Sequence, residues 1–134
     1  MIADKRWVKN LPPREKYLSF ASQCGDYFEA ELEQRYASST GCAGQALKEN
    51  NPTYYDSEKR KKPDHSLSST QREVTDHVNS ILSVPIYPDN DQSRPPIGVL
   101  NLDSPKNISN TKFDTGQAQT FAMKYAGIIG DVIS

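Results

Sequence analysis

The chain has 134 residues, 35% of them hydrophobic, and its 16 basic and 17 acidic residues leave a formal net charge of −1. This length fits one domain, residues 1–134, and the low hydrophobic fraction predicts a small core with long polar loops. No apolar run approaches the ~20 residues of a membrane span, and the near-zero net charge does not indicate a basic surface for binding nucleic acid. Two cysteines are too few for a disulfide scaffold, and without a signal-like apolar stretch we expect a cytoplasmic protein.

The first part of the chain predicts extended structure. Residues 5–25 contain two apolar segments around a proline-rich turn, which is typical of a hairpin. In residues 26–36 the apolar side chains recur at i, i+4 and i+8, which favours a helix and leaves a strand as the alternative.

A glycine-rich helix start follows at residues 38–47, where a hydroxyl side chain can cap the first turn. Asn50-Asn51-Pro52 should end this helix, and Thr53-Tyr54-Tyr55 predicts a short strand. Neighbouring side chains of a strand alternate between its two faces. One of Tyr54 and Tyr55 should therefore face the core and the other a pocket.

The middle of the chain is its most polar part. Residues 57–68 predict a loop. A short helix should follow, because Thr70 and Glu73 have the spacing of a capping box and three apolar residues between 74 and 81 recur at i, i+4 and i+7.

Two strands are predicted next, at residues 81–87 and 97–102, as antiparallel neighbours joined by the polar connector 88–96. Pro85 lies within the first of them and has no N–H to donate to a neighbouring strand. We therefore expect an edge or a bulge at that point.

The last segment predicts a helix of about five turns. Asp114 can cap it, with Gln117 three residues later. Seven apolar residues form one stripe that must pack on a sheet or on a partner helix, namely Ala118, Phe121, Ala122, Tyr125, Ile128, Ile129 and Val132. Because the stripe reaches almost to the last residue, we expect the chain to be cut from a longer one.

The order of these segments resembles the GAF domain, a sensory relative of the PAS domain. Five pieces carry the likeness: the Gly-x-x-Gly-x-Ala turn 41–46, the strand 54–56 ending in Asp, the Ser-x-x-x-Val-Pro strand 80–86, the strand 97–104, and Phe113 before the final helix. The likeness covers residues 16–133, and residues 1–15 match poorly. The opening helix of the family has no counterpart, which indicates a truncated or divergent module and puts the usual dimer in doubt.

The resemblance implies an α+β fold in which helices pack on one face of an antiparallel sheet, with a long C-terminal helix and a ligand pocket on the opposite face. The polar segment 57–80 would form the lid of that pocket. A nucleotide-like anion could be attracted by Lys59-Arg60-Lys61-Lys62, although a solvated loop is the favoured interpretation of this run. The expected ligand-binding residues are Tyr54, Tyr55, Asp56, His77 and Ser80.

We expect no catalytic residue, metal site or bound cofactor. Some GAF domains reduce free methionine sulfoxide with cysteines, but Cys42 lies one residue before the position those enzymes use and no cysteine follows it. A buried core role for Cys42 is favoured. His65 and His77 do not have the spacing of a helical metal pair.

The sequence therefore predicts a sensory or regulatory module of a signalling protein. A small molecule would lie between sheet and lid, and its differential affinity for two lid states would bias the final helix. The alternative is a ligand-free interaction module that forms a homodimer through the same helix. Free methionine sulfoxide reductase is the remote alternative.

Overall fold

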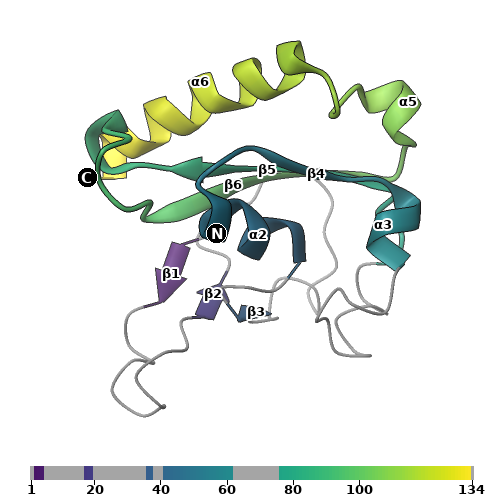
Figure 1. Cartoon of the computed structure of the whole chain (residues 1–134), viewed down its shortest axis with the longest axis horizontal. Helices are drawn as coiled ribbons and strands as arrows, with labels where there is room; N and C mark the ends of the chain where they lie inside the picture. Colours follow the sequence, from purple (N-terminus) through teal and green to yellow (C-terminus); the bar gives the residue numbers. More distant parts are fainter. Residues whose placement is uncertain (1, 5–16, 20–35, 38–40, 62–75, 134) are drawn as a thin grey trace.

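An antiparallel sheet and a long C-terminal helix dominate the computed structural model of this chain (Figure 1). The structure describes residues 2–4, 17–19, 36–37, 41–61 and 76–133. Within these residues the fold is α+β, as the sequence predicts.

The sheet has six strands in the order β3-β2-β1-β6-β5-β4, and every described pair is antiparallel. The longest pair is β5 with β6, which is in register from Ser80↔Ser104 to Ile86↔Gly98. The strands are β1 (Ile2–Asp4), β2 (Tyr17–Ser19), β3 (Tyr36–Ala37), β4 (Thr53–Tyr55), β5 (Ser80–Ile86) and β6 (Gly98–Ser104).

The strands predicted at 81–87 and 97–102 are confirmed as β5 and β6, each shifted by one or two residues. The connector 88–96 begins with the short 3-10 helix η3 (Pro88–Asn90). Its end is closed by the Ile97 amide, which donates to the Ile86 carbonyl at 2.8 Å. The predicted antiparallel hairpin with an enlarged loop is therefore correct.

Pro85 lies in the part of β5 that does not pair with β4. Strand β4 pairs with β5 only from Tyr55↔Ile81 to Thr53↔Ser83, so among the described strands β5 is flanked by β6 alone at Pro85. A residue without an N–H is tolerated at such a place. The expectation of an edge at Pro85 is confirmed.

Helix α2 (Gly41–Glu49) precedes β4. Gly41 has a φ of 65°, which favours glycine, and Asn50 closes the helix in the left-handed region at a φ of 55°. The predicted end at residues 50–52 and the short strand after it are confirmed. The hydroxyl cap expected at residues 38–40 lies outside the described residues.

The predicted polar loop 57–68 begins differently in the structure. Residues Ser57–Lys61 form a short helix, α3, whose first turn is fixed by the Lys59 amide donating to Asp56 Oδ1 at 2.7 Å. The helix predicted across residues 70–81 is wrong where it is described. Residues 76–79 form a turn and β5 begins at Ser80, because pairing with β6 competes successfully with the helical spacing.

At the start of the chain, residues 26–35 of the predicted helix lie outside the described part. Tyr36 belongs to β3, so the extended alternative holds at that residue. Of the segment 5–25, residues 17–19 are described and form β2. In the parts of the chain that the structure describes, no helix has both the length and the apolar character needed to cross a membrane.

Helices cover both faces of the sheet, which differs from the expected arrangement on one face (Figure 1). On one face, α6 (Gly116–Ile133) packs against the β5 side chains Leu82, Val84 and Ile86. On the other face, α2 packs against β4 and β5. The reason is that β5 buries residues of both faces, so both need cover.

The C-terminal helix is capped by Thr115 and not by Asp114. The Ala118 amide donates to Thr115 Oγ1 at 3.3 Å, and α6 begins at Gly116. The expected capping box of Asp114 with Gln117 is therefore wrong: the Thr115 hydroxyl takes the capping position, and Ala118, three residues later, has no side-chain oxygen that could complete a box.

The predicted single apolar stripe of α6 is divided in the structure. Small residues face the sheet: Ala122, Ala126, Gly127 and Gly130 are buried. Four large members of the stripe, Phe121, Tyr125, Ile128 and Val132, are exposed. Close contact between α6 and the connector after β5 leaves no room for side chains at Gly127 and Gly130, while Met123 and Ile129 pack against the core.

Candidate functional site

The sheet face beneath α2 carries a row of polar side chains from three neighbouring strands. Register places Thr53 beside Ser83 and Ser83 beside Asn101, while Tyr55 and Asp103 flank Ile81 one step along. Because side chains two residues apart share a face, these residues lie together under α2. We call this set the polar face: Thr53, Tyr55, Ser83, Asn101 and Asp103.

Hydrogen bonds connect the centre of the polar face. Ser83 Oγ donates to Asn101 Oδ1, and Asn101 Nδ2 donates to Asp103 Oδ1 at 2.5 Å. Ser83 is fully buried, whereas Asn101 and Asp103 are half-buried. The relay therefore orients one amide and ends on a carboxylate, which is an acceptor for N–H and O–H groups.

Cys42 of α2 covers the inner end of this row. Its thiol donates to the Thr53 carbonyl oxygen at 3.2 Å. Burial raises the pKa of the Cys42 thiol to about 12, and the nearby Asp103 carboxylate adds to the effect while Lys59 opposes it. The side chain is a neutral thiol at neutral pH, and a neutral thiol is a poor nucleophile.

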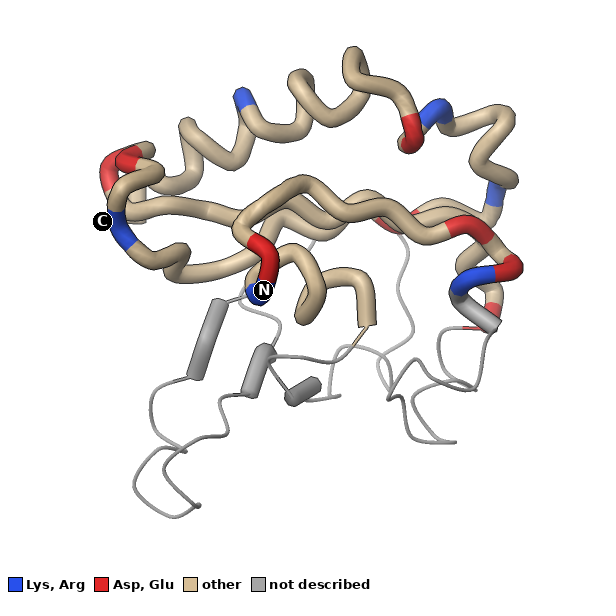
Figure 2. Tube along the Cα trace, in the orientation of Figure 1, with Lys and Arg blue, Asp and Glu red and all other residues tan. Residues whose placement is uncertain are grey.

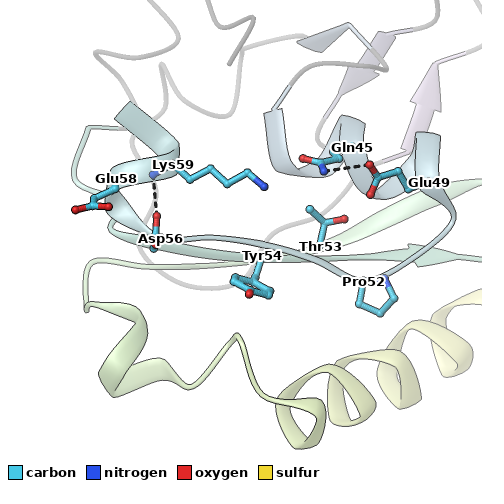
Figure 3. A pocket seen from close by; sticks show the side chains of 8 residues that line it. All are labelled: Gln45, Glu49, Pro52, Thr53, Tyr54, Asp56, Glu58 and Lys59. Carbon is cyan, nitrogen blue, oxygen red and sulfur yellow. Dashed lines mark hydrogen bonds between the residues drawn. The ribbon is translucent and has the colours of Figure 1, made fainter. Parts of the chain in front are cut away.

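A cavity of about 440 Å³ opens along β4, between α2 and α3 (Figure 3). Figure 3 shows Gln45 and Glu49 of α2 on one side and Glu58 and Lys59 of α3 on the other. The lining residues are Gln45, Glu49, Pro52, Thr53, Tyr54, Asp56, Glu58 and Lys59.

Tyr55 joins the cavity to the polar face. Its hydroxyl donates to Gln45 Oε1 at 2.8 Å, and Lys59 Nζ lies 4.7 Å from the centre of its ring. The buried ring thus links α2, β4 and α3, and a cation over an aromatic face is held there by the ring quadrupole. Because Thr53 belongs to the polar face and also lines the cavity, the two adjoin one another along β4.

The described cavity lining is acidic. Three of its side chains are carboxylates, Glu49, Asp56 and Glu58, and Lys59 is the cation among them. Acidic positions also flank the start of α3 in Figure 2. Such a lining provides more acceptors than donors to a bound molecule.

Three of the five predicted ligand-binding residues lie together. Asp56 lines the cavity, and Tyr55 contacts two of its lining residues. Tyr54 borders the cavity, but its ring points to the other side of β4, away from Gln45 and Lys59 (Figure 3). The two rings alternate between the faces of β4, as expected: Tyr55 is buried on the polar face, whereas Tyr54 lies on the α6 side and is 41% exposed.

The other two predicted residues lie elsewhere. His77 is exposed in the turn before β5 and does not belong to the cavity lining. Ser80 is buried on the α6 side of the sheet, where its hydroxyl donates to the Lys106 carbonyl at 2.8 Å and lies 3.1 Å from Thr111 Oγ1 of α5 (Ile108–Thr111). Its contacts attach α5 to the sheet.

The sequence prediction missed Asn101 and Asp103. Their signal is two polar residues at i and i+2 that alternate with Leu100 and Leu102, which places both on one face. The serine opposite them, Ser83, could be matched to Asn101 only once the register of β5 and β6 was known. Most of the expected lid, residues 62–75, lies outside the described part of the chain.

Within the described ranges, no cluster of three or more His, Cys, Asp or Glu side chains is arranged to bind a metal ion. Comparison of the chain with protein-family models, with curated proteins and with solved structures gave no match.

Proposed function

We propose that this chain is a GAF-like sensory module that binds a small polar molecule in the cavity beside the polar face. The observation that carries the proposal is the hydrogen-bonded relay from Ser83 through Asn101 to Asp103, which lies beside the cavity-lining residue Thr53. Buried polar groups cost stability unless they are satisfied, and clusters of oriented polar groups next to a concavity are typical of ligand sites.

The chemistry of the site favours a ligand that presents N–H or O–H groups. The relay ends on a carboxylate, and three further carboxylates line the cavity beside one lysine. A phosphate would face this acidic lining at an electrostatic cost. The proposal therefore replaces the nucleotide-like anion expected from the basic run at 59–62 with a neutral or cationic ligand rich in hydrogen-bond donors.

Signal transfer would use the shared strand. Strand β5 contributes Ser83 to the polar face and Leu82 and Val84 to the contact with α6. A ligand that binds two arrangements of the polar face with different affinity shifts their populations. Helix α6 packs against Leu82 and Val84 on the other face of β5, so its position would change with these populations.

Cys42 gives no support to the reductase alternative. The thiol is buried and its pKa is raised to about 12, so the thiolate that such chemistry needs is scarce at neutral pH. Cys24 lies outside the described residues.

The test is thermal unfolding of the full chain with a panel of small polar amines, amides, polyols and nucleotides. A ligand at one hundred times its Kd stabilises the folded state by about 2.7 kcal/mol, which raises Tm by on the order of 10 °C. We expect amine or amide members of the panel to raise Tm and free phosphate to leave it unchanged.

The matched variants are Asn101→Ala, which removes the centre of the relay, and Asn110→Ala, which removes an exposed amide on α5. Asn101→Ala should abolish the ligand-dependent rise, and Asn110→Ala should retain it. A flat response of the folded wild-type chain to the whole panel would contradict the proposal, as would a rise that survives in Asn101→Ala.

A further inference from the structure

Helix α6 carries an outward row of large apolar side chains, which we call the outer stripe: Phe121, Tyr125, Ile128 and Val132. Their exposed fractions are 60%, 47%, 51% and 77%. The rings of Phe121 and Tyr125 pack on one another with centroids 4.9 Å apart. Figure 2 shows few charged positions along this helix. A continuous exposed apolar row of this kind marks an interaction surface.

The outer stripe faces away from the sheet because glycines fix the rotation of the helix. A Cβ at Gly130 would overlap the backbone carbonyl oxygen of Tyr87, and a Cβ at Gly127 would lie 3.0 Å from the Asn90 side chain. Rolling the helix to bury Phe121 or Ile128 would bring larger side chains into this contact. The exposure of the stripe therefore follows from the packing of the opposite side.

The spacing of the outer stripe suits a second helix of the same sequence. Successive members are four, three and four residues apart, which is the a/d spacing of a helix that packs along a partner helix. Two charges flank the stripe on one side, Lys124 and Asp131, seven residues apart.

Charge complementarity selects the orientation of the partner. In an antiparallel pair with Tyr125 opposite Ile128 of the second copy, Lys124 of each helix lies beside Asp131 of the other. The two-fold axis creates this ion pair twice. In a parallel pair, Lys124 and Asp131 of one helix face the other edge of the stripe on the partner helix. That edge carries the uncharged residues Ala122 and Ile129. The antiparallel arrangement alone pairs both charges.

We propose that the outer stripe of α6 docks antiparallel on the same stripe of a second copy of this chain, with Lys124 of each copy facing Asp131 of the other. This interface does not depend on the proposed ligand site, which lies on the opposite face of the sheet. A specific interface buries about 800 Å² per partner, and four partly exposed side chains provide only the centre of such an area. We therefore expect a weak dimer whose population rises with protein concentration.

Analytical ultracentrifugation of the full chain tests the dimer, with Ile128→Lys as the disruptive variant and Asn110→Lys as the control that adds the same charge on α5. We expect the wild type and the control to dimerise as concentration rises, and Ile128→Lys to raise the dimer Kd at least ~tenfold. Ile128 is exposed, so circular dichroism and Tm of this variant should match the wild type.

Charge exchange tests the orientation. Lys124→Asp and Asp131→Lys should each raise the dimer Kd by roughly severalfold, because each leaves like charges opposed at two places. An equimolar mixture of the two single variants should associate more tightly than either variant alone, and the double variant should recover wild-type association.

Three outcomes would overturn the inference. The first is a wild-type chain that is still monomeric at about 1 mM. The second is a dimer that is unaffected by Ile128→Lys or by the charge exchange. The third is a monomer that binds phosphatidylserine vesicles and loses this binding in Ile128→Lys, which would assign the stripe to a membrane surface.

Discussion

The two faces of the central sheet differ in what they bury, although they are built from the same two strands. On the α6 face, Leu82, Val84 and Ile86 pack against alanines in an apolar layer. On the α2 face, Ser83 and Asn101 form a hydrogen-bonded relay that ends at Asp103. Burial of an apolar layer stabilises the fold but does not depend on the orientation of the groups. Hydrogen-bonded polar groups must be oriented, and they contribute less net free energy of folding. The difference teaches that one strand, β5, can support an apolar core with one side and a hydrogen-bonded polar face, the proposed ligand site, with the other.

The largest expected effect is loss of stability from the apolar face. Leu82 is fully buried, and Leu82→Ala removes its packing and leaves a cavity, so we expect a loss of about 3 kcal/mol in the free energy of unfolding. Chemical denaturation monitored by circular dichroism measures the loss. Ile128→Ala, at an exposed site on α6, is the control and should change stability by less than about 0.5 kcal/mol at concentrations where the chain is monomeric. Equal losses in the two variants would contradict the described packing of α6.

The next effect concerns the close approach of α6. Gly130→Ala places a methyl group against the Tyr87 carbonyl oxygen, and the resulting shift of the helix should cost about 2 kcal/mol. Gly116→Ala is the matched control, because a Cβ at that residue meets no atom within 4 Å. The control should be neutral or should stabilise the chain by up to about 1 kcal/mol, since alanine restricts the unfolded chain more than glycine does. Thermal unfolding of both variants decides the point, and a neutral Gly130→Ala would mean that α6 packs less closely on the connector.

On the polar face we expect a smaller and coupled effect. Asn101→Ala leaves Ser83 without its acceptor and Asp103 without one donor, so the free energy of unfolding should fall by about 1–2 kcal/mol. Once Asn101 is absent, removing the Ser83 hydroxyl should cost much less. A double-mutant cycle with Ser83→Ala should therefore give a coupling energy of about 1 kcal/mol. Additive losses would show that the two side chains do not act as a relay.

The contrast between the faces also explains how far the sequence could predict this molecule. The strands β5 and β6 and the helix α6 were predicted because their apolar periodicity is local. The division of the α6 stripe was missed, since the contact between Gly130 and the Tyr87 carbonyl arises from tertiary packing that periodicity does not contain. Strand alternation predicted that Tyr54 and Tyr55 lie on opposite faces of β4, but it did not say which of them lies on the polar face.

Asn101 was missed for a related reason. Its importance depends on the register that brings it opposite Ser83, and register is a property of two strands and not of one segment. Ser80 was assigned to the ligand site from the family resemblance, but its parity along β5 places it on the α6 side with Leu82. Tyr55 pairs with Ile81, so Ile81 lies on the same face as Tyr55 and its neighbour Ser80 lies on the other face. Strand alternation would therefore have excluded Ser80 from the polar face.

The smallest expected effect is the pH dependence that Cys42 confers on the polar face. Burial raises the pKa of this thiol to about 12 from an ordinary value of 9.0, so the folded chain keeps the proton at pH values where the unfolded chain releases it. The contribution of the neutral thiol to stability is complete below pH 9 and is lost as pH rises from there toward 12. Between pH 8 and pH 10 the loss should be about 1 kcal/mol. Because tyrosines also titrate near pH 10, the quantity to measure is the difference between wild type and Cys42→Ala in denaturation curves at both pH values. If this difference does not change with pH, the Cys42 thiol is accessible to solvent, and α2 does not pack on β4 as closely as the structure shows. The polar face would then be open to solvent beside Cys42.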